Sequence, residues 1–428
     1  MSLVSFLGII VYSFSRKYMK GDVRYSHFFR NMLLLLLSVI LMAVSDNLFL
    51  FWITLCCSNW MLAKLIVHKS SWKAAKASGR LAMQNFILGC SCIALAFVLM
   101  YLITGKSSIQ YIVHHPDDSL YMAFALIMLL IGAMTQSAIW PFHRWLISSL
   151  NAPTPVSAIM HAGIVNAGGF LLARFAPLYF SMPKILNMIF IVGLITALLG
   201  SLWKLMQHDV KRMLASSTMG QMGFMFVQCG LGLFPAAMAH LCWHGMFKAY
   251  LFLASGGAAQ EKRLQLGYPP RFIIFLFALA FGVFGTYVFV KVSNINWFAA
   301  DTTLVLVSIV FIAGTQLALM ILRDSSFKMW PLAMIVTGIM GSIYGINVYF
   351  FDFILSPLNL MQAQALNMLH IIALILLVFA WLFMVFIRYS NYAGQFPNWL
   401  LSLYVKTLNS SQPHPATITT YRKEYEYV

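Results

Sequence analysis

Runs of about twenty apolar residues follow one another along most of this chain, and they constrain its fold more than any other feature. A helix needs about 20 apolar residues to cross the hydrocarbon core of a bilayer, where its backbone groups must be hydrogen-bonded internally. Hydrophobic residues make up 61% of the chain and charged residues 9%, whereas soluble domains carry about 25% charged residues. So apolar a chain could not cover a water-facing surface, and the sequence predicts an all-α, polytopic membrane helix bundle.

On this scale the sequence contains about thirteen candidate spans, of which the first two are short. They are residues 2–14, 30–45, 47–67, 81–104, 120–141, 155–175, 184–206, 211–230, 233–256, 270–292, 301–322, 330–353 and 366–388. We expect one transmembrane domain over residues 1–390 and a cytoplasmic C-terminal tail over residues 391–428. The tail either lies along the membrane face, docks a partner or is a poorly ordered terminus. The first run lacks the basic start and cleavage site of a signal peptide, so we expect a short span there.

Charge alternates between successive gaps in this series of spans. The formal net charge is +17, which in a soluble protein would favour nucleic-acid binding. Here the basic residues lie in every second gap, as Lys73 and Arg80 do, whereas the next gap holds Asp117 and Asp118. Because loops rich in lysine and arginine stay on the cytoplasmic side, we expect a multi-pass protein in lipid with a cytoplasmic C-terminus and no nucleic-acid partner.

Three ionisable residues recur every four positions within one candidate span, namely His240, His244 and Lys248. On a helix this spacing places them on one face. A charge at the bilayer centre costs at least about 2.5–3.5 kcal/mol, so such groups need a reason to be there. Histidine titrates near neutral pH, and the stripe therefore indicates a proton or cation relay. Two alternatives are hydrogen-bonded structural histidines and a metal site, for which the sequence offers the HxxxH pair but no evident third ligand.

A second group of candidate residues lies in the segment LNAPTPVSAIMHAG. Pro153 and Pro155 stand just before a candidate span, where prolines either break a helix or begin one. His161 follows about two helical turns later. A lone buried histidine is often a hydrogen-bonded core residue, but the neighbouring histidine stripe favours a place for His161 on the path, with the two prolines as a possible hinge.

A third group surrounds the start of another candidate span. Lys211 opens that span and is followed by a polar run that includes Thr218. The alternative to a role on the path is that the lysine reaches back to the membrane surface. Gln136 and Pro141 mark an interrupted helix of the kind found at transport sites, and we treat them as a possible part of the path or hinge. The chain has no phosphate-binding loop or nucleophile motif, so we expect a transport subunit without catalytic residues.

At these motifs the sequence resembles a known superfamily. The segments IWPFHRWLISSLNAPTPVSAIMHAGIVNAGGFLLAR, DVKRMLASSTMGQMGFMF and HLCWHGMFKAYLFLASG resemble proton-translocating antiporter-like subunits of respiratory complex I and of multisubunit sodium/proton antiporters. The resemblance covers roughly residues 10–260. Three shorter segments, PFHRWL, SSLNAPTPVSA and HLCWHG, are similar to segments of the DabB family of subunits from bacterial inorganic-carbon uptake complexes.

The resemblance implies an antiporter-like fold in the bacterial cytoplasmic (inner) membrane. It implies passage of protons or another cation such as sodium, which drives CO2 hydration or bicarbonate accumulation by a partner. In the DabB family that partner is DabA, a zinc-containing protein on the cytoplasmic side related to β-carbonic anhydrases. The cofactor is thus expected in the partner, with none and no metal in this chain. The family's path residues carry over to His161, Lys211, His240, His244 and Lys248.

Two positions depart from the respiratory relatives. Where those subunits carry a glutamate, this chain has Cys56, and where they carry a lysine before the proline, it has Gln136. We also expect the chain to start late in the family pattern and to lack the two N-terminal helices and the long C-terminal lateral helix. The missing pair and the expected short C-terminus count against one rival, a respiratory or sodium/proton antiporter subunit. The same missing pair leaves a second rival open, a membrane anchor that conducts nothing, although an inert anchor would have no need of costly buried bases.

Overall fold

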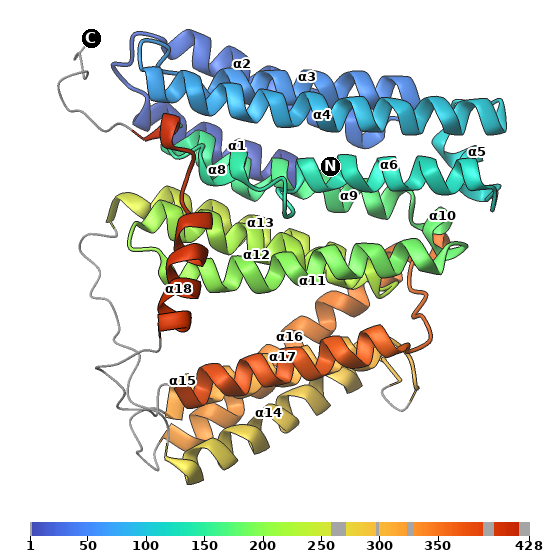
Figure 1. Cartoon of the computed structure of the whole chain (residues 1–428), viewed down its shortest axis with the longest axis vertical. Helices are drawn as coiled ribbons and strands as arrows, with labels where there is room; N and C mark the ends of the chain where they lie inside the picture. Colours follow the sequence, from blue (N-terminus) through green and yellow to red (C-terminus); the bar gives the residue numbers. More distant parts are fainter. Residues whose placement is uncertain (1, 258–270, 297–298, 323–328, 388–397, 419–428) are drawn as a thin grey trace. The chain divides into compact units, whose positions relative to one another are not determined.

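Long helices account for nearly all of the regular structure in the computed structural model, which describes residues 2–257, 271–296, 299–322, 329–387 and 398–418 (Figure 1). The helices are α1 (Ser2–Tyr18), α2 (Tyr25–Val44), α3 (Leu48–Ile66), α4 (Lys73–Thr104), α5 (Ile109–His114), α6 (Leu120–Gln136), α7 (Arg144–Ile147), α8 (Thr154–Ala162), η1 (Ile164–Asn166), α9 (Ala167–Arg174), α10 (Ala176–Phe180), α11 (Pro183–Met206), α12 (Val210–Gly230), α13 (Phe234–Leu253), η2 (Ala254–Gly257), α14 (Phe272–Ser293), α15 (Thr303–Ile321), α16 (Met329–Leu355), η4 (Ser356–Leu358), α17 (Met368–Ile387), α18 (Asn398–Ser410) and η5 (Pro415–Thr417). No β-strand occurs within these described ranges. The prediction of an all-α membrane protein is therefore confirmed.

Each candidate span from the sequence coincides with a helix or, for residues 155–175, with the interrupted pair α8 and α9. Nine helical segments of the described chain are long and apolar enough to cross a membrane. The other four predicted spans are α1 and α6, with 17 residues each, and the more polar α12 and α13. The chain is a multi-pass membrane protein.

The main differences from the predicted spans lie at helix ends. Helix α4 begins at Lys73, eight residues before the apolar run from which its span was inferred. Lysine, alanine and arginine all favour helix, so the helix continues through the charged segment. Helix α6 ends at Gln136, five residues earlier than expected, because residues 137–143 form turns and no helix. The peptide bond between Trp140 and Pro141 in this segment is cis.

The described chain divides into two compact units, and one of the boundaries between them falls inside α13. The first unit comprises Met1–Gly230, His240–Glu261 and Leu403–Val428, and the second comprises Leu231–Ala239 and Lys262–Ser402. The predicted boundary between a domain of residues 1–390 and a tail of residues 391–428 lies in a stretch outside the described residues, so it stays a prediction.

Close helix packing positions α12 in the first unit. A Cβ added to Gly200 of α11 would collide with the backbone of Gly220 of α12, and small residues at such crossings allow two helices to approach closely in a membrane. Figure 1 shows α11 and α12 running side by side. Thr218 lies two residues before Gly220, so the crossing positions this part of α12.

The second unit contains α14 to α17. Its core joins Ile274 and Ala278 of α14 with Ala318 of α15 and Ala333 of α16. Trp381 of α17 donates a hydrogen bond of 3.3 Å from Nε1 to Oε1 of Gln316 on α15. All of the candidate path residues from the sequence lie in the first unit.

The described part of the C-terminal tail contacts the first unit through hydrogen bonds. Gln207 Nε2 donates to Ser411 Oγ at 2.8 Å, and an Nη atom of Arg212 donates to Gln412 Oε1 at 2.9 Å. Asn151 Nδ2 donates to the carbonyl oxygen of Thr417 at 2.8 Å. Residues 411–417 therefore form an ordered segment, and the alternative of a poorly ordered terminus does not apply to them.

Candidate functional site

Helix α13 carries the stripe of two histidines and one lysine on its inner face. His244 and Lys248 are 6% and 1% exposed, and His240 is half-buried. Trp243 and Phe247, on the adjacent face of the helix, are both exposed. The rings of His240 and His244 stack with their centres 5.9 Å apart, so the spacing of four residues places them on one face as predicted.

A chain of hydrogen bonds links Lys248 to His161 across three helices. Lys248 Nζ on α13 donates to the backbone carbonyl oxygen of Leu214 on α12 at 3.0 Å. The same carbonyl accepts from Thr218 Oγ1 at 2.9 Å. Thr218 Oγ1 lies 3.1 Å from Nδ1 of His161 on α8. Because the threonine hydroxyl donates to the carbonyl, its oxygen accepts a hydrogen bond from the Nδ1–H of His161.

His161 is fully buried at the end of α8, just before the helix is interrupted. Its ring stacks on Phe252 of α13 with centres 4.3 Å apart. Pro153 is the N-cap residue and Pro155 lies in the first turn of α8, where a fixed φ and a missing N–H do no harm. Of the two roles considered for the prolines, they therefore begin the helix, and the interruption comes at Gly163 and the turn η1.

Glycine at position 245 allows α13 to approach this interruption. A Cβ added to Gly245 would lie 2.6 Å from the carbonyl oxygen of Ala162. That carbonyl accepts a hydrogen bond of 2.7 Å from Nδ2 of Asn166. The side chain of Asn166 thus replaces a bond that the interrupted helix would otherwise make, and the close contact keeps Lys248 beside His161.

The end of α6 meets the same interruption. Ser137 Oγ donates to the carbonyl oxygen of Val165 in η1 at 2.6 Å. Gln136 is buried, and neither polar atom of its side chain has a hydrogen-bond partner among the described residues. His143 is also buried and lies against the ring of Trp203, with centres 4.9 Å apart. Gln136 and Pro141 thus belong to the turn that abuts the helix interruption, and their role on a path or hinge stays a prediction.

Lys211 lies half-buried at the start of α12. The ammonium groups of Lys248 and Lys211 are both within electrostatic range of His161. His244 is in turn within range of His240, Lys248 and His161. The structure therefore brings all five candidate path residues into one group of interacting bases.

Two members of the hydrogen-bonded link between Lys248 and His161 were not predicted as site residues from the sequence. Thr218 was noted only as one of several polar residues, although its position two turns after Lys211 placed it on the same helix face. The carbonyl oxygen of Leu214 has no sequence signal, because every residue carries one. Cys56, where the resemblance to respiratory subunits led us to expect a glutamate, lies half-buried on α3.

Within the described part of the chain, no three histidine, cysteine, aspartate or glutamate side chains gather in a way that could hold a metal ion. His240 and His244 stack instead of converging on one point. Stacked rings direct their nitrogens along their own planes, so this arrangement does not favour the metal alternative for the HxxxH pair.

Comparison with known proteins identifies relatives for the part of the chain that holds this site. Residues 45–267 match the family model described as NADH:quinone oxidoreductase/Mrp antiporter, TM. The probable inorganic carbon transporter subunit DabB1 of Halothiobacillus neapolitanus is 40% identical over 279 residues, which cover 62% of this chain and 49% of that protein. The NAD(P)H-quinone oxidoreductase subunit 5, chloroplastic, of Lemna minor is 35% identical over 278 residues, covering 63% of this chain and 37% of that protein.

A solved structure shares the fold. The Mrp complex from Dietzia sp. DQ12-45-1b aligns with a TM-score of 0.58 at 20% identity, over 95% of this chain and 46% of that one. The antiporter-like fold and the similarity to DabB subunits are confirmed. The chain spans about half the length of the DabB relatives that it matches.

Proposed function

Because the chain belongs to the NADH:quinone oxidoreductase/Mrp antiporter transmembrane family, we propose that it is a transport subunit that passes protons or another cation through its first unit. The groups proposed to carry the ion are His161, Lys211, His240, His244 and Lys248. The observation that supports this most directly is the hydrogen-bonded link from Lys248 through Leu214 and Thr218 to His161. Buried bases are costly in a membrane, and this link holds two of them at a helix interruption.

The link positions the two bases more than it carries a proton. A carbonyl oxygen only accepts hydrogen bonds, so the Leu214 carbonyl holds the Lys248 ammonium and the Thr218 hydroxyl close together and passes no proton between them. The Nε2 atoms of His161, His240 and His244 are buried and have no hydrogen-bond partner among the described residues. Buried polar atoms of this kind are usually satisfied by ordered water, so we infer that water completes the path between the rings.

The similarity to DabB subunits supports a more specific assignment. We propose that ion movement through this chain drives inorganic-carbon uptake, with CO2 hydration performed by a zinc-containing, DabA-like partner on the cytoplasmic side. The chain itself would bind no cofactor and catalyse no reaction. The alternating basic gaps support insertion in a bacterial inner membrane with the C-terminus in the cytoplasm.

One rival assignment has a specific observation in its favour, namely the similarity to chloroplast quinone oxidoreductase subunits. It would make this chain a proton-translocating subunit of a respiratory-type complex or a sodium/proton antiporter. Cys56 and Gln136 stand where the resemblance to respiratory subunits implies a glutamate and a lysine, so this pair of opposite charges is missing. The third possibility, an inert anchor, gives no reason for burying Lys248 at 1% exposure.

Purification from the native membrane distinguishes these assignments. A stable complex with a zinc-containing protein supports carbon uptake, whereas an assembly with flavin or iron–sulfur groups contradicts it. A functional test is growth in air of a strain that lacks carbonic anhydrase. The intact chain and its partner should restore growth, and His244→Ala should abolish it with normal assembly. Unchanged growth of that variant would count against the path.

A further inference from the structure

The basic end of α4 projects beyond the length that a membrane span requires. A helix of 32 residues is about 48 Å long at about 1.5 Å per residue, whereas the hydrocarbon core is about 30 Å thick. Lys73, Lys76 and Arg80 occupy the first turns, all three exposed, and the apolar run begins at Leu81. The charged turns therefore lie at the depth of lipid headgroups.

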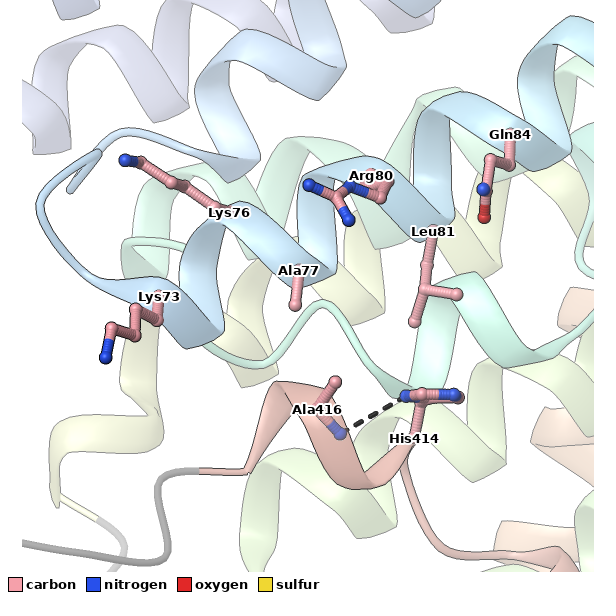
Figure 2. Close-up of a pocket in the computed structure, with 8 residues that line it drawn as sticks. All are labelled: Lys73, Lys76, Ala77, Arg80, Leu81, Gln84, His414 and Ala416. Atoms are coloured by element: carbon pink, nitrogen blue, oxygen red, sulfur yellow. Dashed lines mark hydrogen bonds between the residues drawn. The ribbon is translucent and has the colours of Figure 1, made fainter.

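A surface cavity of about 430 Å³ lies between these turns and the C-terminal tail (Figure 2). Its volume falls within the range of about 300–1,000 Å³ typical of small-ligand sites. The three basic residues line it together with Gln84 of α4 and His414 of the tail. None of the described residues that line it is acidic, so the cavity offers several hydrogen-bond donors with positive charge and no carboxylate to repel an anion.

The tail wall of the cavity is held in place by hydrogen bonds to α4 and its neighbours. The backbone N–H of His414 donates to Ser148 Oγ at 2.9 Å. Ser78 of α4 in turn donates from Oγ to the carbonyl oxygen of Ser148 at 2.7 Å and accepts from Asn151 Nδ2 at 3.1 Å. Ser148 and Thr417 are both buried. The tail thus closes one side of the cavity as a fixed part of the first unit.

The ring of His414 is oriented within this wall. The backbone N–H of Ala416 donates to His414 Nδ1 at 3.2 Å, the bond drawn in Figure 2. With Nδ1 accepting, the neutral ring carries its proton on Nε2 and keeps one donor. Figure 2 also shows Ala77 and Leu81 pointing from α4 toward the tail turn. They give the cavity an apolar wall next to its cations.

We propose that this cavity binds the phosphate group of an anionic membrane lipid. Lysine and arginine supply charge-assisted hydrogen bonds to phosphate oxygens, and each basic residue near an anionic membrane surface adds to the attraction. The apolar wall at Leu81 lies where the glycerol and the first acyl carbons of such a lipid would continue toward the bilayer. The same phosphate chemistry occurs in free phosphate, which lacks the chains that this wall would contact.

The test uses the full chain isolated in detergent, with any co-purifying subunit retained. Native mass spectrometry would measure binding of short-chain phosphatidylglycerol, phosphatidylcholine and inorganic phosphate. We expect phosphatidylglycerol to bind about ten-fold more tightly than phosphatidylcholine, and the double variant Lys76→Gln/Arg80→Gln to lose this preference. The matched control Lys17→Gln/Lys20→Gln removes two exposed cations near the end of α1 and should keep the preference. Arg80→Lys alone should retain most of it, which separates charge from folding effects.

Three results would overturn the proposal. The first is equal binding of the two lipids, or a preference that survives in the Lys76→Gln/Arg80→Gln variant. The second is displacement of phosphatidylglycerol by inorganic phosphate at equal concentration, which would assign the cavity to a free anion. The third is loss of a co-purifying soluble subunit from the double variant with unchanged lipid binding, which would make the cavity a protein contact.

Discussion

Lys248 Nζ and the backbone carbonyl oxygen of Leu214 are joined by a hydrogen bond of 3.0 Å, deep between α13 and α12. This bond connects the inner face of α13 to α12, the helix that carries Lys211 in its first turn. Through Thr218 it reaches His161 at the interruption of α8. A lysine of 1% exposure is thus held by a backbone carbonyl, which replacement of the Leu214 side chain does not remove, whereas the hydroxyl of Thr218 can be removed by substitution.

Replacing Thr218 by valine should uncouple His161 from this link. The substitution keeps the shape but removes the hydroxyl, which leaves His161 Nδ1 buried without its partner, at a cost of about 1–3 kcal/mol. We expect ion flux to fall about ten-fold, whereas Thr218→Ser, which keeps the hydroxyl, should stay close to the native rate. Flux into membrane vesicles and thermal unfolding in detergent measure the two effects. Equal rates for valine and serine would show that the hydroxyl plays no part.

Gly245→Ala should destabilise the contact between α13 and the end of α8. The added Cβ would lie 2.6 Å from the Ala162 carbonyl oxygen, and overpacking of this kind costs about 1–3 kcal/mol. The matched control is Gly256→Ala, where nothing lies within 4 Å of the added atom. Thermal unfolding should show a lower midpoint for Gly245→Ala alone. A midpoint equal to that of the control would contradict the close packing.

The carboxyl group of Asp22, which lies between α1 and α2 outside the membrane spans, should make the stability of the fold depend on pH. Burial raises the pKa of its carboxyl, but a hydrogen bond of 2.8 Å from the Arg24 N–H and the His68 ring at 3.1 Å outweigh this, and the pKa is lowered from 3.8. A carboxyl whose folded pKa lies below its unfolded pKa stabilises the fold above the unfolded value, and this contribution is lost as the pH falls through the folded pKa.

The difference in unfolding free energy between the native chain and Asp22→Asn should therefore be about 1 kcal/mol near neutral pH. It should shrink as the pH falls below 3.8. Denaturant unfolding over this range measures it, with Asp118→Asn, at an exposed position, as the control. A difference that stays constant with pH, or grows on acidification, would contradict the account.

The helices and the histidine stripe could be predicted from the sequence because both depend on local spacing. Apolar runs of sufficient length predicted every described helix of 17 or more residues, but not the shorter α18. A spacing of four residues placed His240, His244 and Lys248 on one face. The ends of α4 and α6 were misplaced because hydropathy measures the membrane-facing length of a helix and not its hydrogen-bonded length. Lys73 extends one helix, and the turn at Pro141 shortens the other.

The contacts between helices could not be predicted from the sequence. Nothing in the local pattern of α12 indicates that the Leu214 carbonyl accepts from Lys248, since the two residues are 34 positions apart. The division of the described chain inside α13 likewise depends on packing and leaves no mark in composition. The docking of Thr417 on Asn151 joins residues 266 positions apart, so the tail's alternatives stayed open until its partners were known.

The most direct test of the ion path is flux into membrane vesicles under an imposed proton gradient, and separately a sodium gradient, for Lys248→Ala and for Lys64→Ala. Lys64 is an exposed lysine at the end of α3, so its replacement removes a charge without touching the link to His161. We expect Lys248→Ala to lower the flux of the coupling ion about ten-fold or more with normal assembly, and Lys64→Ala to leave it unchanged. A properly assembled Lys248→Ala protein with native flux would contradict the path.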